Sequence, residues 1–167
     1  MSRLTDLYET LDNLIHLHQA LYTLAAEKKP VLIRGDADAL TQITHQEQKL
    51  IKAVQTAENT RMELVRELMA ERGVTLREGT ISELIQSLTS AEEKVRLARY
   101  RNDLLEIVTR LRDANDLNQQ LLEQSLSFVQ MSLDLLTDRP EEDYVYKHPK
   151  GLTGNPFAAR SFINQKA

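Results

Sequence analysis

The chain has 167 residues, no cysteine, a formal net charge of −4 and a sequence pI near 5.6. This length favours one domain, or one domain with a tail, and the missing cysteines exclude disulfides and zinc–thiolate sites. The acidic balance argues against a nucleic-acid-binding protein, and no apolar run approaches the roughly 18 residues of a membrane span. Leu, Ala, Glu, Gln, Lys and Arg dominate and aromatic residues make up only 5%, a composition typical of long helices.

Two long helices are predicted first, over residues 3–34 and 37–72. Both contain apolar residues at alternating steps of three and four, the spacing of a coiled-coil-like seam. Pro30 is expected to bend the first helix or to remove one hydrogen bond near its end, and Gly35 to terminate it. Asp36 is a natural N-cap for the second helix. Because the connection is so short, the two helices must pack as an antiparallel hairpin.

A short helix and a very long one are predicted next, over residues 81–88 and 90–136. Thr80 and Glu83 form a capping box before the short helix, and Ser90 begins a second box. The long helix contains no Gly or Pro, and its 46 or so residues would span roughly 69 Å. These elements predict an all-α fold, an antiparallel bundle of three long helices with a short extra helix and coiled-coil-like packing.

Residues 138–167 differ in character, because they hold three of the four prolines and two of the five glycines without any helical period. We therefore expect a bundle domain over residues 1–137, followed by a flexible C-terminal tail. The tail nevertheless carries Tyr144, Tyr146 and several other large apolar side chains. Such a segment either orders on binding a partner or docks on its own bundle, and the sequence leaves both alternatives open.

The long predicted helix carries an apolar stripe that three polar residues interrupt. One interpretation is control of helix register by buried Asn, and the other is a groove that accepts a guest segment. We favour the groove, although the two roles can coexist. The helix is expected to overhang the second helix by about 15 Å and to expose apolar side chains there. The expected groove residues are Asn115, Asn118, Leu121, Leu122, Ser125, Phe128, Val129, Leu133 and Leu136.

Patterns that mark enzymes and metal sites are missing from the sequence. It has no Gly-rich phosphate loop, no His-Glu-x-x-His motif and no Glu-x-x-His pair. His16 and His18 lie about 200° apart around a helix, so they cannot share a ligand face. We expect no catalytic residue, no metal and no cofactor. The basic patch Arg96 to Arg101 is expected to be a solvated helix face, so we expect no nucleic-acid partner. The polar faces of the helices carry mixed or acidic charge, so we expect no stable membrane insertion.

Two segments of the chain are similar to a known family. One is A-E-K-K-P-V-L-I-R-G-D-A-D-A-L (26–40), followed by E-Q-K-L (47–50), and the other is N-D-L-N-Q-Q-L-L-E-Q-S-L-S-F-V (115–129). In this order and spacing they resemble the FlgN family of flagellar export chaperones, over about residues 5 to 136 in all. Pro30 stands where the family's pattern has a plain helix former.

The resemblance implies a cytoplasmic chaperone of the flagellar type III export apparatus, which itself uses no ATP or metal. Its clients would be the hook-associated proteins, which form the hook–filament junction. It would bind their disordered C-terminal segments, prevent premature assembly and deliver them to the export gate protein. The family's client region lies toward the C-terminal helix, which agrees with the groove. The family also docks on the gate through a tyrosine near its C-terminal region, for which Tyr144 and Tyr146 are candidates.

The alternative interpretation is a structural coiled-coil adaptor that self-associates through the same stripe and carries no client. Such an adaptor should be a tight oligomer. A chaperone is instead expected to be a monomer or a weak homo-oligomer until its client is added. The N-terminal residues lack the apolar core of a signal peptide, so a cytoplasmic location is expected for either protein.

Overall fold

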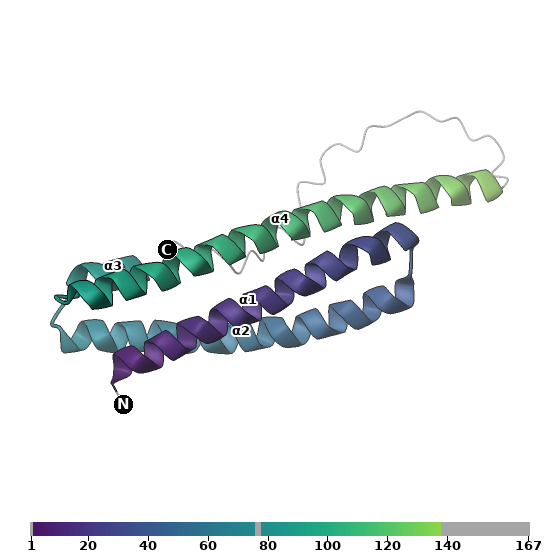
Figure 1. The fold of residues 1–167 in the computed structure, drawn as a ribbon. Coiled ribbons are helices and arrows are strands. Elements are labelled where there is room, and N and C mark those ends of the chain that lie inside the picture. Colours follow the sequence, from purple (N-terminus) through teal and green to yellow (C-terminus); the bar gives the residue numbers. More distant parts are fainter. Residues whose placement is uncertain (1, 76–77, 138–167) are drawn as a thin grey trace. The chain divides into compact units, whose positions relative to one another are not determined.

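The computed structural model describes residues 2–75 and 78–137, and all regular structure in these ranges is helical (Figure 1). The predicted all-α class is therefore confirmed, and the bounds of each helix differ from the prediction by no more than one residue. The predicted tail lies outside the described residues. The helices are α1 (Arg3–Arg34), α2 (Ala37–Glu71), α3 (Ile81–Ser87) and α4 (Ala91–Leu136).

Two compact units divide the chain, and the boundary between them falls inside α4. The first unit ends at Ser125 and the second begins at Leu126. The helix itself is continuous across this point. The expected domain boundary at residue 137 stays a prediction.

The helix ends follow from local sequence. Gly35 adopts a left-handed conformation with φ of 67°, which a glycine tolerates without strain, and it terminates α1. Asp36 then caps α2 by accepting a hydrogen bond of 3.0 Å from the backbone N–H of Ala39. Pro30 does not end α1, because it lies within five residues of the terminus, where its missing N–H leaves only the carbonyl of Ala26 without its helical donor.

Ion pairs at both ends of the hairpin fix the relative direction of α1 and α2. Arg3 near the start of α1 pairs with Glu67 near the end of α2, with an N–O distance of 2.9 Å. Lys28 near the end of α1 pairs with Glu47 in the first half of α2, at 2.7 Å. The two helices are therefore antiparallel, as their short connection requires (Figure 1).

Helix α4 runs in the same direction as α1 within the first unit. The rings of Tyr8 and Tyr100 stack with centroids 5.6 Å apart. Further along both helices, the Nδ2 of Asn118 donates to the carbonyl oxygen of Ala25 at 2.7 Å. Because both pairs advance together along the two helices, α4 is parallel to α1 and opposite in direction to α2.

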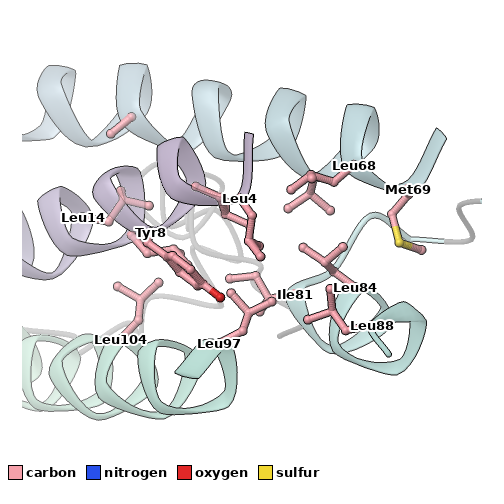
Figure 2. Close-up of a cluster of buried hydrophobic side chains, with 14 of the residues drawn as sticks. Leu4, Tyr8, Leu14, Leu68, Met69, Ile81, Leu84, Leu88, Leu97 and Leu104 are labelled. Carbon is pink, nitrogen blue, oxygen red and sulfur yellow. The ribbon is translucent and has the colours of Figure 1, made fainter. Parts of the chain in front are cut away.

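The main core lies where all four helices meet, as Figure 2 shows. Helix α3 begins at a complete capping box, in which Thr80 and Glu83 satisfy each other's backbone N–H groups. This fixes α3 so that its apolar side chains enter the cluster from one end of the bundle. Side chains with less than 2% exposure come from every helix: Leu7, Leu11, Leu14, Val65, Met69, Leu84 and Leu97.

Candidate interaction surface on the last helix

One row of positions on α4, spaced seven residues apart, changes from apolar to polar along the helix. Leu97, Leu104 and Leu111 occupy it first, and all three are buried against the other helices. Asn118, Ser125 and Ser132 occupy it next. Residues seven apart lie on nearly the same side of a helix, so the side of α4 that forms the core continues into a polar row.

Asn118 is part of the packed bundle and not of an open surface. Its side chain is only 5% exposed, and its amide nitrogen donates to the carbonyl oxygen of Ala25 in α1. A buried Asn with a single partner on a neighbouring helix fixes the alignment of the two helices. The two predicted roles were register control and groove lining, and the contact of Asn118 with Ala25 is the kind that register control requires. Asn118 also lies at the inner border of the expected groove.

Ser125 and Ser132 are satisfied by their own helix. Each hydroxyl donates to the backbone carbonyl four residues earlier, on Leu121 and Phe128 respectively, at 2.9 Å in both cases. Both serines are half-buried. Because their polar atoms are already bonded, they present little more than a small Cβ group and need no hydrogen bond from a partner.

The remaining predicted groove residues leave large apolar area open to solvent. Phe128 is 64% exposed and Leu136 is 83% exposed, while Leu121 is half-buried. At 3.6 residues per turn, all nine predicted residues fall within an arc of about 140° on α4. They therefore share one side of the helix, which we call the apolar face. Its exposed members are Asn115, Leu122, Phe128, Val129, Leu133 and Leu136.

The predicted groove does not include three residues that widen the apolar face. Leu126, Met131 and Leu135 are all more than half exposed. All three lie outside the stripe of threes and fours. The sequence signal that could have identified them is the high density of large apolar residues after position 120. One helix stripe that faces a bundle core is too narrow to hold all of these residues.

In the basic patch between Arg96 and Arg101, Arg96 and Arg99 are exposed, as expected of a solvated helix face, and two arginines also make contacts with other helices. The guanidinium carbon of Arg96 lies 4.0 Å from the ring centroid of Tyr8, which is a cation–π contact. Arg101 donates to the hydroxyl of Ser82 in α3 at 3.2 Å. These contacts tie α4 to α1 and α3 and give the patch a structural role in the described fold.

Other expected features can be located only in part. Across residues 2–75 and 78–137, no three His, Asp or Glu side chains gather in a way that could hold a metal ion. Within the same ranges, no helix is both long enough and apolar enough to cross a membrane. Tyr144 and Tyr146, the candidates for docking on an export gate, lie outside the described residues.

Comparison with known proteins identifies the family. Residues 1–154 match the family described as FlgN protein. The chain belongs to the FlgN family. FlgN proteins are flagellar export chaperones and not enzymes, so membership places this chain among chaperones of flagellar biogenesis.

The chain is also similar to a curated protein of a named organism. The chain is 32% identical over 138 residues to the uncharacterized protein YvyG of Bacillus subtilis (strain 168). The match covers 83% of this chain and 82% of that protein, so the two are similar over most of their lengths. No solved structure is significantly similar to the chain.

Proposed function

We propose that this FlgN-family protein is a chaperone of the flagellar type III export system that binds the C-terminal segments of hook-associated proteins. Binding prevents the premature assembly of these hook–filament junction proteins and delivers them to the export gate. The observation that carries the proposal is the apolar face of α4, where Phe128, Val129 and Leu133 are all more than half exposed. Exposed apolar patches of this density mark surfaces that bind other proteins.

The chemistry of the apolar face suits a helical guest. Large side chains stand on both sides of the row that contains Ser125 and Ser132, and the two serines are small and internally bonded. A guest helix can therefore approach closely over the serines while its own apolar residues pack against Leu122, Phe128 and Val129. Asn115, exposed at the inner end of the face, can bond a polar group of the guest.

The energetics fit a partner that must later be released. A hook-associated protein that has not yet assembled exposes apolar surface, and packing it on α4 removes that surface from water. Burying about 600 Å² of apolar area at roughly 25 cal/mol/Å² gives about 15 kcal/mol before costs. Ordering of the two partners offsets most of this, which leaves binding in the micromolar to nanomolar range.

Delivery to the gate is assigned to the segment after α4. The resemblance to FlgN proteins supports Tyr144 and Tyr146 as the residues that dock on the export gate protein. Because these tyrosines are separate in sequence from the apolar face, changing them leaves the proposed client-binding side chains in place. A variant of the tyrosines is therefore expected to lose gate docking and to keep client binding.

The proposal is tested by binding of a fluorescent peptide from the C-terminus of a hook-associated protein. Leu122→Asp and Phe128→Asp are expected to abolish binding and to leave the helical circular dichroism unchanged, because both side chains are exposed. Val95→Asp is the matched control, since Val95 is 72% exposed on α4 but lies far from the apolar face. If the two test variants bind like the Val95 variant, the apolar face is not the client site.

A self-associating adaptor is the second candidate, because the same exposed apolar residues could pair two copies of the chain. Sedimentation of the full chain distinguishes the two functions. A tight oligomer whose mass does not change when the peptide is added supports the adaptor. A monomer or weak oligomer that gains the mass of one peptide per chain supports the chaperone.

A further inference from the structure

The second compact unit begins with an unusually apolar stretch of helix. Seven of its first eleven residues are large apolar residues that are more than half exposed, and they span about 16 Å of helix. A surface of this kind is expected to be covered when no partner is bound, since it otherwise promotes aggregation. The residues are Leu126, Phe128, Val129, Met131, Leu133, Leu135 and Leu136.

The charge around this surface has one sign. Between residues 113 and 137 the sequence contains four acidic residues and no Lys or Arg. Glu123 and Asp134 each accept a hydrogen bond of 3.3 Å from a Gln four residues away, and no ion pair joins any of the four to another described residue. This part of α4 therefore carries acidic residues and no basic one, and two of the acids, Glu123 and Asp134, lie within one turn of the exposed apolar residues. The four acids are Asp113, Asp116, Glu123 and Asp134.

The chain itself contains a segment of complementary chemistry. Residues 144–167 carry four basic residues and no acidic one, together with seven large apolar residues. The basic residues are Lys147, Lys150, Arg160 and Lys166, and the apolar ones are Tyr144, Val145, Tyr146, Leu152, Phe157, Phe162 and Ile163. The basic residues of this segment thus complement the acidic residues of α4, and its apolar side chains can pack against the exposed apolar residues there.

We propose that residues 144–167 fold back onto α4 and cover its exposed apolar residues between 126 and 136. Pro140 lies three residues beyond Thr137, where it disfavours continuation of the helix and so favours a change of direction. The 24 residues of the covering segment can extend to about 80 Å, far more than the length of the surface. Because the segment is tethered next to the surface, even weak contacts are populated at a high effective concentration.

This inference does not require the proposed client. If both are correct, the covering segment and the client compete for the same side chains, and the segment acts as a replaceable cover. The opposite charges supply part of the attraction, so the docked form should weaken as salt rises from low concentration. The apolar contacts supply the remainder.

Cross-linking of the full chain tests the proposal directly, because the sequence has no cysteine to interfere. Gln130→Cys is placed at the edge of the apolar surface, and Ser161→Cys is placed beside Phe162. The matched control carries the same two cysteines with the three lysines of the segment reversed (K147E, K150E, K166E), and Arg160 is kept so that the charge next to the new thiol is unchanged. Tether length and the residues next to both thiols are equal in the two proteins, so a difference in disulfide formation reports docking.

We expect the unreversed segment to form the disulfide at least ten times faster than the charge-reversed control at low salt. The charge-reversed chain without cysteines should also bind several times more of an apolar fluorescent dye than the wild type. Equal cross-linking rates with equal dye binding would overturn the proposal. The proposal would also be overturned if the wild type and the charge-reversed chain both sedimented as dimers and both bound little dye. The apolar surface would then be covered by a second copy of the chain. Neither readout involves a client, so failure of the proposed function would be recognised separately.

Discussion

Replacing Phe128 by Ala is expected to weaken client binding strongly without affecting the fold. Phe128 is 64% exposed, and its backbone carbonyl accepts only the local hydrogen bond from Ser132. Truncation of its ring therefore removes no contact on which the described core depends. Alanine also has a high helix propensity, so α4 should remain intact.

The magnitude follows from the area that the ring offers to a partner. A Phe side chain can bury about 200 Å², and the 64% exposed fraction leaves about 130 Å² for a guest. At roughly 25 cal/mol/Å² this area contributes about 3 kcal/mol. Because Ala retains a small part of the contact, we expect a loss near 2.5 kcal/mol, which is about a 60-fold weaker Kd.

Fluorescence anisotropy with a C-terminal peptide of a hook-associated protein measures this change. Val95→Ala is the matched control, because it truncates a highly exposed apolar residue of the same helix outside the apolar face. The control should change Kd by less than twofold. A Phe128→Ala protein that binds within threefold of wild type would refute the assignment of the ring to the client surface.

Three further predictions concern other parts of the chain. Tyr8→Phe should raise the free energy of unfolding by about 1 kcal/mol in urea denaturation, because no described residue bonds its buried hydroxyl. Burial raises the Tyr8 pKa above its ordinary value of 10.0, so Tyr8 should make wild-type stability fall as pH rises above 10, and the fall should be smaller in the Phe variant. A destabilised Phe variant would show that the hydroxyl has a partner. Asn118→Ala should cost about 1–2 kcal/mol through the lost bond to Ala25, whereas Asn118→Leu should retain stability but increase the concentration dependence of the solution mass. Tyr144→Ala combined with Tyr146→Ala should bind the client at least as tightly as the wild type and lose affinity for the export gate protein, and unchanged gate affinity would remove these tyrosines from the docking site.

The helices could be predicted closely from the sequence because the signals that bound them are local. Gly35 can adopt the left-handed conformation that ends α1, and Asp36 and Thr80 have side chains that cap the next helices. Alternation of apolar residues at steps of three and four then identifies the buried sides. None of these signals depends on residues far away in the chain.

The role of Asn118 could not be decided from the sequence. Its position in an apolar stripe fits both a buried register residue and a groove residue, since both place an amide among leucines. The difference lies in whether α1 reaches that level of α4, which depends on packing between residues 93 positions apart. Neighbouring Asn115 has the same local pattern and is exposed.

The extent of the apolar face was predicted only in part, for a related reason. The periodic stripe identified Leu122, Val129 and Leu136, which are all exposed. Periodicity shows which residues share a side but not where along a helix the neighbouring helices stop covering that side. Met131 and Leu135, outside the stripe, became part of the surface only through the exposure that the structure shows.

Calorimetric titration of the full chain with a C-terminal peptide of a hook-associated protein, at two temperatures, measures whether the chain binds this client. We expect binding of one peptide per chain with a negative heat-capacity change, because apolar area on both partners leaves water. The Phe128→Asp chain should give no binding heat, and the Val95→Asp chain should behave as wild type. The absence of binding heat from the wild-type chain at both temperatures would rule out client binding by this peptide and favour the self-associating adaptor.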